Sequence, residues 1–403
     1  MLTELSRKLC SLSLGTWRIG SSTSESAGLT TVQKVPGNFS LIVIFCSTGV
    51  HKFSGIHSVP EGLVLKVDEM RIAIPTDAWH PQVSGVVTKF ERIARELEQM
   101  GHEVCLITPD MFRTVPCPTY PQIRLALYPN KKMAEILDSF APDFIHLAIE
   151  GPIGFAARSY CMEAGYPFTT SYTTRFPEYI KMRFPIPLRI SYSVFRWFHS
   201  ASSGVMVSTP ALISELGKWG FKNLVQWTPG VDTTLFSPAR PGIVTDKRPI
   251  LMFVGRVAVE KSIEEFLDLN LEGTKYVVGD GPDFTRLKAK YPEVRFVGFK
   301  SGEELAGYYA SADVFVFPSR TDTFGLVILE ALASGVPVAA YPVRGPLDII
   351  RQGETGFLDE QLGNAIVQAM TIDGRKCREF ALSHDWTRSA RQFIDNLAII
   401  RRN

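Results

Sequence analysis

Two carboxylates flank a short run of backbone amides in the last third of the chain. Seven residues separate Asp322 from Glu330, and Phe324 and Gly325 lie between them. Residues 312–318 predict a buried strand, and the pattern after them predicts a helix with the second acid about two turns along it. Carboxylates accept hydrogen bonds from hydroxyl groups, and amides at a helix N-terminus receive an anion. The segment therefore predicts a site for a sugar joined to a diphosphate.

A pair of cations follows an earlier predicted strand. Arg256 and Lys261 lie around the turn that begins at Gly255. Two cations at the carboxyl end of a strand are placed to hold a diphosphate and to neutralise its charge as it leaves. The alternative is a pair of solvated surface cations. We favour diphosphate binding because the two-acid segment follows in the same half of the chain.

Length and composition limit the class of protein. At 403 residues the chain is too long for one core and suits two domains of roughly 150 residues each. Apolar residues make up 45% and charged residues 21%, as in globular proteins. The net charge of +2 gives no bulk electrostatic reason to expect nucleic acid. Six scattered cysteines without a C-x-x-C motif fit a reducing cytosol and argue against disulfides or zinc.

Short strands alternate with helices in both halves of the chain. Strands are predicted at 71–75, 103–108, 143–148, 168–171 and 205–208, and again at 250–254, 275–278, 294–297, 314–317 and 336–340. Such alternation predicts parallel sheets covered on both faces. We therefore expect an α/β protein with Rossmann-like domains at 70–235 and 236–385, a closing helix from 386 to 403, and a ligand cleft at the carboxyl ends of the strands. Residues 1–69 are expected to be an over-extended start or a disordered leader, with a targeting peptide as the alternative.

Two positions of the first half are candidates for the cleft. Gly85 lies between the strand 71–75 and the helix 86–100, and a small residue there lets the backbone approach a phosphate or an acceptor hydroxyl. Glu150 follows the strand 143–148 and is the predicted cleft residue of that segment. His146 lies within the same strand and is predicted to be a core histidine.

A segment rich in cations and aromatic residues runs from 175 to 199. It contains five cations and one acid. Cations mixed with exposed aromatic rings bind an anionic membrane surface, each cation contributing on the order of 1 kcal/mol. The alternative is an ordinary helix with core aromatics and solvated cations. The predicted surface residues are Arg175, Lys181, Arg183, Arg189 and Trp197.

These motifs resemble the retaining, nucleotide-sugar-dependent glycosyltransferases of family 4 (group 1), from Met70 to about Arg391. Asp322 stands where the family more often has Glu, and residues 255–261 resemble its G-R-x-x-x-E-K stretch. The resemblance implies a GT-B fold, with two Rossmann-like domains facing across a cleft. It also implies that Arg256 and Lys261 bind the donor diphosphate, that Glu330 takes the ribose hydroxyls, and that Asp322 takes sugar hydroxyls.

The resemblance also predicts further substrate-binding residues, and this chain departs from the family pattern at one position. Thr173 replaces the His of an S-Y-H-T segment, but a retaining enzyme with front-face displacement needs no protein base, since the leaving phosphate accepts the proton. No metal and no cofactor are expected besides the donor substrate. The predicted substrate-binding residues are Gly85, Glu150, Gly255, Gly279, Phe299, Thr323, Phe324, Gly325 and Leu326.

Within the family, segments 150–152, 321–325 and 342–346 resemble the subgroup that glycosylates diacylglycerol-type lipids. The implied reaction moves a hexosyl or hexuronosyl unit from a UDP-sugar to such a lipid, on the cytoplasmic face of the plasma membrane. A GDP-mannose-dependent mannosyltransferase is the second choice. A nucleotide-sugar 2-epimerase of the same fold and a non-catalytic sugar-nucleotide sensor are the alternatives from other classes.

Overall fold

The computed structural model describes two strands at 41–46 and 49–54 and residues 69–82, 84–118, 121–320, 322 and 324–400. The chain divides into one unit at 1–68 and another at 69–403. In the first unit, β1 (Leu41–Cys46) pairs antiparallel with β2 (Gly49–Ser54). The other residues of the expected leader lie outside the described residues, so its nature stays a prediction.

The first domain of the larger unit is built on a parallel sheet of six strands with the order β10-β9-β8-β7-β3-β4. Its strands are β3 (Arg71–Pro75), β4 (Glu103–Ile107), β7 (Phe144–Leu147), β8 (Thr169–Tyr172), β9 (Gly204–Val207) and β10 (Leu224–Gln226). Its helices are α2 (Gly85–Gln99), α3 (Asn130–Phe140), α4 (Pro152–Ala164), α5 (Phe176–Arg183), α6 (Leu188–His199) and α7 (Pro210–Lys218). A short 3-10 turn (Pro109–Met111) leads into an antiparallel pair, β5 (Thr114–Pro116) and β6 (Arg124–Ala126).

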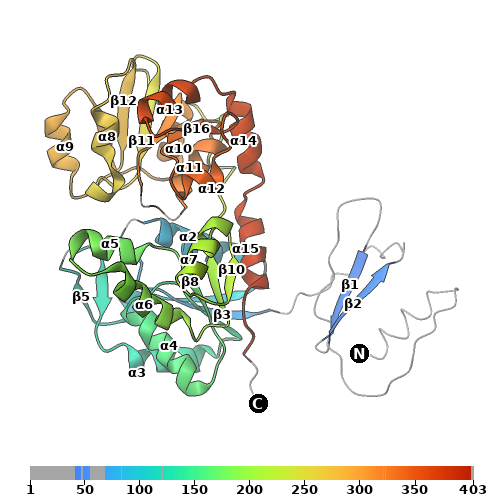
Figure 1. The fold of residues 1–403 in the computed structure, drawn as a ribbon. Coiled ribbons are helices and arrows are strands. Elements are labelled where there is room, and N and C mark those ends of the chain that lie inside the picture. Colours follow the sequence, from blue (N-terminus) through green and yellow to red (C-terminus); the bar gives the residue numbers. More distant parts are fainter. Residues whose placement is uncertain are drawn as a thin grey trace. The chain divides into compact units, whose positions relative to one another are not determined.

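The second domain repeats the design with the strand order β13-β12-β11-β14-β15-β16, again all parallel (Figure 1). Its strands are β11 (Ile250–Val254), β12 (Thr274–Val278), β13 (Arg295–Gly298), β14 (Val314–Phe317), β15 (Val338–Ala340) and β16 (Gly356–Leu358). Its helices are α8 (Ile263–Leu267), α9 (Phe284–Lys290), α10 (Gly302–Ser311), α11 (Leu326–Ala333), α12 (Pro346–Ile349), α13 (Leu362–Ala369) and α14 (Gly374–Leu382), with a 3-10 turn at Val259–Lys261.

Strand β11 shows why the second sheet is covered on both faces. All five of its residues are apolar and buried. Met252 and Val254 pack into one hydrophobic cluster, and Leu251 and Phe253 pack into another. Because successive side chains of a strand point to opposite faces, an unbroken apolar run requires a layer of helices on each side.

The predicted strands are all present, with ends that shift by one or two residues. Two edge strands, β10 and β16, were not predicted. Each has only three residues, and most of these are half-buried or exposed. A short, partly exposed edge strand has no unbroken apolar run and no regular alternation that the sequence pattern could register.

Helix α2 begins and ends as its sequence predicts. The Ser84 hydroxyl accepts a hydrogen bond from the Val87 amide at 3.4 Å and so caps its N-terminus. Phe90, Ile93 and Leu97 are fully buried on its inner face. Gly101, with φ of +91°, ends the helix.

The last helix, α15 (Trp386–Asp395), packs against the first domain, although the chain reaches it from the second (Figure 1). Trp227 is fully buried and donates from Nε1 to the Ser389 carbonyl at 3.1 Å. Phe393 packs on Trp227 with the ring centroids 4.9 Å apart. The helix ends at Asp395 and is shorter than the predicted 386–403. Beyond it, the Ile400 amide donates to the Asp143 carbonyl at 2.8 Å.

We expect Phe393→Ala to lower the free energy of unfolding by roughly 3–5 kcal/mol, because it leaves a cavity among Trp227, Phe90 and His146. Urea unfolding followed by tryptophan fluorescence measures the change. The matched control is Ile399→Ala at a position that is 56% exposed. Equal stability of the two variants would contradict this account of how α15 is held.

Candidate functional site

The predicted cation and the first predicted acid form an ion pair. Lys261 ends the 3-10 turn after β11, and Asp322 follows β14, the next strand in the sheet. Lys261 Nζ lies 2.6 Å from Asp322 Oδ1 and 2.8 Å from Oδ2. The side chains are 21% and 14% exposed. The sequence analysis assigned Lys261 to the donor diphosphate and Asp322 to sugar hydroxyls, and it did not predict their contact with each other.

Glu330, the second acid, lies on α11 and is half-buried. Tyr309 of α10 donates its hydroxyl to Glu330 Oε2 at 2.9 Å. Burial raises the pKa of the Glu330 carboxyl to about 7, while the Tyr309 hydrogen bond and the charge of Arg92 act in the opposite direction. The carboxyl is therefore close to half-ionised at neutral pH.

The amides of Phe324 and Gly325 lie at the N-terminus of α11, where the sequence analysis expected them. Gly325 is the N-cap residue of α11 and has φ of +90°. A Cβ at this position would lie 3.2 Å from the Phe317 ring and 3.1 Å from Ile328, so both conformation and space favour glycine. Phe324 is buried in the core of the second domain. Thr323 lies outside the described residues.

Helices α11 and α2 meet at their N-termini. A Cβ on Gly85, the first residue of α2, would lie 3.6 Å from Leu326 Cδ1, the first residue of α11. Leu326 also packs against the hydrophobic cluster of the first domain. Two residues that were predicted from opposite halves of the chain are thus in contact.

Two predicted glycines line the turns at the carboxyl ends of β11 and β12. Gly255 has φ of +153° and Gly279 has φ of +143°. A Cβ on Gly279 would lie 1.8 Å from the Gly255 carbonyl oxygen, so the two turns approach too closely for a side chain. Arg256, the next residue, is half-buried, and Phe299, after β13, is 51% exposed. This packing accounts for the glycine at 279, whereas a Cβ on Gly255 would lie 3.2 Å from the Phe253 ring.

Glu150 does not face the cleft as expected. Its side chain is 1% exposed, and its Oε1 lies 2.8 Å from His199 Nε2 on α6. Glu150 does follow β7, as predicted. Its carboxylate is buried because it pairs with His199 of α6. His146 is the core histidine that the sequence predicted, fully buried between the hydroxyls of Thr169 and Ser171 at 2.8 and 2.7 Å.

Asp77 is a residue that the sequence analysis missed. It follows β3 at the carboxyl edge of the first sheet and is 6% exposed. Its oxygens accept hydrogen bonds from the amides of Ile153 at 2.8 Å and Gly154 at 3.0 Å, which caps α4. Burial raises the pKa of this carboxyl to about 6. The sequence could have pointed to Asp77 through its position directly after a predicted strand, next to the loop that holds Gly85.

The basic segment divides into a buried part and an exposed part. Arg175 was predicted to lie on the surface, and this is wrong: it is 9% exposed and binds Glu215 through two hydrogen bonds. Lys181 and Arg189 are exposed, as is Trp197. The Arg183 side chain lies outside the described residues.

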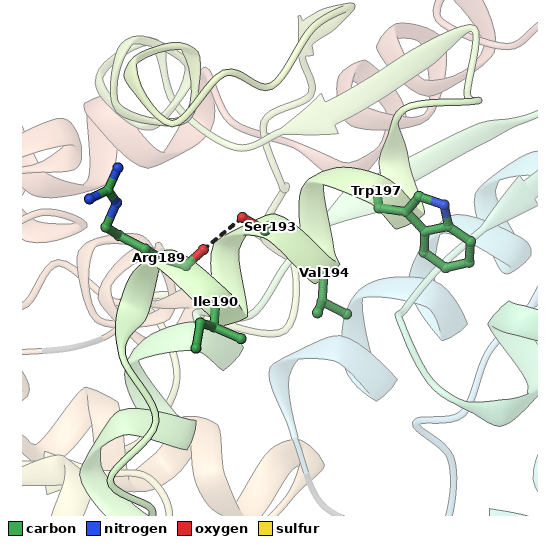
Figure 2. Close-up of a pocket in the computed structure, with 5 residues that line it drawn as sticks. All are labelled: Arg189, Ile190, Ser193, Val194 and Trp197. Atoms are coloured by element: carbon green, nitrogen blue, oxygen red, sulfur yellow. Dashed lines mark hydrogen bonds between the residues drawn. The ribbon is translucent and has the colours of Figure 1, made fainter.

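Helix α6 carries an exposed apolar face. Ile190 (57% exposed) and Val194 (50%) point to the same side of the helix, with Trp197 (54%) one turn further along (Figure 2). Together with Arg189 and Ser193 they line an open hollow of about 500 Å³. Phe155 of α4 stacks against Trp197 with the ring centroids 6.2 Å apart. We call Arg189, Ile190, Val194 and Trp197 the α6 face.

We expect Glu330→Gln to be more stable than the wild type above pH 7 and equal to it near pH 4.5. The folded pKa of this carboxyl is about 7 against an ordinary 4.5, so the folded state holds the proton more tightly. Ionisation therefore costs stability progressively as the pH rises between these values, and glutamine avoids that cost. Thermal unfolding at pH 4.5 to 8 tests this, with exposed Glu303→Gln as the control. A constant difference across this range would contradict the raised pKa.

Family models match both domains. A model described as Glycosyl transferases group 1 matches residues 248–371, and one described as Glycosyltransferase Family 4 matches residues 83–235. The first covers Arg256, Lys261, Asp322 and Glu330, and the second begins just before Gly85.

Curated relatives extend over most of the chain. A sulfoquinovosyl transferase of Arabidopsis thaliana is 33% identical over 349 residues, which cover 75% of this chain and 68% of that protein. A GDP-mannose-dependent alpha-mannosyltransferase of Mycobacterium tuberculosis is 32% identical over 315 residues, covering 72% and 83%. An alpha-monoglucosyldiacylglycerol synthase of Streptococcus pneumoniae is 29% identical over 348 residues, covering 75% and 78%.

Solved structures share the fold. A sucrose-phosphate synthase of Thermosynechococcus elongatus superimposes with a TM-score of 0.65 at 23% identity, covering 81% of this chain and 98% of that one. HepE of Anabaena, in complex with UDP and glucose, gives a TM-score of 0.60 at 16% identity, covering 81% and 99%. With both family models and both domains in agreement, the chain belongs to the family 4 (group 1) glycosyltransferases and is a hexosyltransferase of GT-B fold.

Proposed function

We propose that the protein transfers a hexosyl or hexuronosyl unit from a UDP-sugar to a diacylglycerol-type membrane lipid, with retention at the anomeric carbon. The observation that carries this proposal is that a phosphate-suited cation, Lys261, pairs with the first hydroxyl-binding acid, Asp322, just before α11. That helix carries the second acid, Glu330, and meets α2 at its N-terminus. In the same protein, an apolar face stands exposed on α6 of the first domain.

On the donor side, Lys261 and Arg256 bind the diphosphate and stabilise the negative charge that develops as it leaves. When Lys261 turns to the diphosphate, Asp322 gives up its ion-pair partner and accepts hydrogen bonds from sugar hydroxyls. Glu330, with Tyr309 already donating to one of its oxygens, accepts from the ribose hydroxyls. These groups do the work that a divalent ion does in other transferases, so the proposal needs no metal.

The stereochemical course that we propose assigns Asp322 to binding sugar hydroxyls and not to attack on the sugar. Front-face displacement, in which the leaving phosphate accepts the proton of the incoming hydroxyl, needs no protein nucleophile. Retention by this route is therefore the mechanism that we propose.

On the acceptor side, the α6 face is suited to a bilayer. Ile190, Val194 and Trp197 offer apolar surface, and Arg189 and Lys181 add positive charge nearby. Side chains of this kind bind the interface of an anionic membrane. Within the described residues no helix is both long and apolar enough to cross a bilayer. We accordingly propose peripheral binding to the inner face of the plasma membrane.

The relatives also support a lipid acceptor, since one of them is named as an alpha-monoglucosyldiacylglycerol synthase and another as a sulfoquinovosyl transferase. The second candidate function is transfer of mannose from GDP-mannose. It is supported by the mannosyltransferase at 32% identity, which the chain covers over 83% of its length. The two candidates share the donor-site chemistry and differ in the nucleobase and the sugar.

Production of the full chain in a bacterium that lacks glycolipids tests the function. We expect a new hexosyl- or hexuronosyl-diacylglycerol in the mass spectrum of the lipid extract. Lys261→Ala should lower its formation by about a thousandfold, because charge stabilisation at the leaving group is lost. Lys300→Ala, at an exposed pair with Glu304, is the matched control. An unchanged lipid profile with folded protein would favour the mannosyl candidate or a non-lipid acceptor.

Sedimentation with phospholipid vesicles tests the membrane surface. We expect binding to vesicles that contain phosphatidylglycerol to weaken roughly tenfold in Ile190→Glu, because a charge enters the apolar face. The matched control is Val367→Glu on α13 of the second domain, where the apolar residue is 48% exposed. Equal binding of both variants would exclude the α6 face as the docking site.

A further inference from the structure

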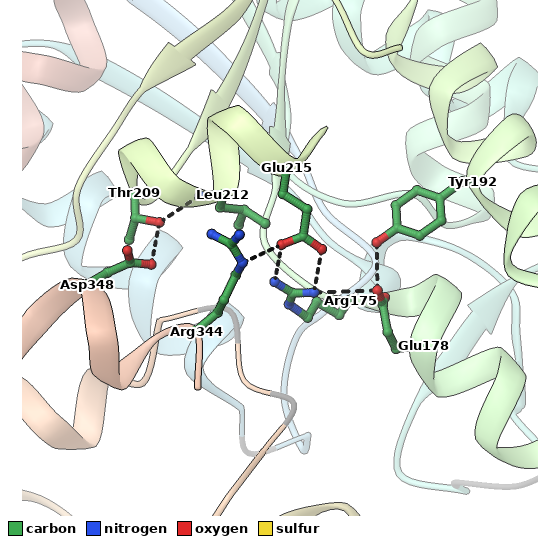
Figure 3. A network of polar contacts seen from close by, with 8 residues as sticks. All are labelled: Arg175, Glu178, Tyr192, Thr209, Leu212, Glu215, Arg344 and Asp348. Carbon is green, nitrogen blue, oxygen red and sulfur yellow. Dashed lines mark hydrogen bonds and ion pairs between the residues drawn. The ribbon is translucent and has the colours of Figure 1, made fainter. Parts of the chain in front are cut away.

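Glu215 of α7 lies between two arginines from different domains (Figure 3). Arg175 of the first domain donates to its two oxygens at 3.0 and 2.9 Å. Arg344 of the second domain places Nε 2.9 Å from Glu215 Oε2. The single carboxylate therefore joins the two domains, as well as fixing Arg175 within its own.

A second contact between the domains lies one and a half turns earlier on the same helix. Thr209, the N-cap residue of α7, donates its hydroxyl to Asp348 Oδ2 at 2.7 Å. The same hydroxyl accepts from the Leu212 amide at 3.2 Å. Asp348 belongs to α12, four residues after Arg344. We call Thr209, Glu215, Arg344 and Asp348 the interdomain clasp.

The clasp adjoins the donor site through Gly345. This residue has φ of +90°, and a Cβ on it would lie 3.2 Å from the carbonyl oxygens of both Asp322 and Phe324. The loop that carries Arg344 is thus packed on the turn that carries the first acid of the donor motif. A movement of this loop away from α7 would carry that turn with it.

On the other side, the clasp reaches the helices that precede β9. Arg175 lies 3.4 Å from Glu178 of α5, and Tyr192 of α6 donates to the same Glu178 oxygen at 2.6 Å. Among the side chains that the structure describes, this network contains two arginines and two glutamates, and Arg344 is one of its two positive charges.

Energetics argue against a role in stability alone. Arg344 is 41% exposed and Glu215 is 20% exposed. A partly exposed ion pair of this kind contributes little to the free energy of folding. Its geometric effect is larger, because a misplacement of about 1 Å between reacting groups costs up to a hundredfold in rate.

We propose that Glu215 and Arg344 are positioning residues for sugar transfer: their ion pair, with Thr209 and Asp348, holds the Asp322–Phe324 turn at the distance from the first domain that transfer requires. The kinetic part of this inference rests on the proposed function, whereas the structural part does not. The clasp residues affect transfer by holding the loop that carries Arg344, whereas other residues bind the donor.

The test uses the full chain and three variants. Arg344→Gln removes the interdomain pair and leaves Arg175 on Glu215, Arg344→Lys restores the charge, and Arg286→Gln removes an exposed ion pair within the second domain as the matched control. Hydrogen–deuterium exchange is measured over 209–218 and 342–350, with the protein alone. Transfer to diacylglycerol vesicles is measured with UDP-glucose and with GDP-mannose.

We expect exchange in both segments to rise together in Arg344→Gln and to stay unchanged in the control. We also expect kcat to fall about tenfold while the donor KM stays within about twofold, with partial recovery in Arg344→Lys. Unchanged exchange in Arg344→Gln would overturn the clasp whatever the activity. A raised donor KM with unchanged kcat would overturn it as well, since Arg344 would then bind the donor. If the wild type transfers neither sugar, the proposed function fails for these two donors and the exchange result alone decides the clasp.

Discussion

The ion pair between Lys261 and Asp322 is the contact that organises the carboxyl edge of the second sheet. It joins the turn after β11 to the segment after β14, two neighbouring strands of one parallel sheet. Because the carboxyl ends of parallel strands meet at one edge, residues 61 positions apart come within hydrogen-bonding distance. Helix α11 begins a few residues after Asp322 and presents Glu330 to Tyr309 and Leu326 to Gly85.

From that edge the second domain reaches the first at two places. Leu326 meets the N-terminus of α2, and the loop at Arg344 meets α7. Helix α15 adds a third tie, because the chain returns to pack Trp386 and Phe393 on the first domain. The contact at Leu326 is apolar, whereas the one at Arg344 is a partly exposed ion pair, which can break and reform at little cost.

The core of the first domain contains hydrogen-bonded polar side chains as well as apolar ones. Thr169, Thr170, Ser171 and Tyr172 form β8, and all four are buried. His146 bonds to Thr169 and Ser171 on one side, and His199 bonds to Thr170 and Glu150 on the other. Each histidine satisfies hydroxyls that would otherwise cost free energy in the interior. The carboxylate of Glu150 is therefore part of the structure of this domain.

The sequence by itself determined the two parallel sheets, the linker between them and the place of the donor motif, because these follow from local apolar runs, glycine turns and the spacing of Asp322 and Glu330. It did not determine which way a side chain at the end of a strand points. Glu150 and Arg175 were assigned to a cleft and to a surface, and the tertiary structure buries both because α6 and α7 supply His199 and Glu215 as partners. Charge pairing between segments far apart in the chain leaves no periodic signal. The Lys261–Asp322 pair was therefore decided only when β11 and β14 came together in one sheet, and the contact of Arg344 with Glu215 only when the two domains packed.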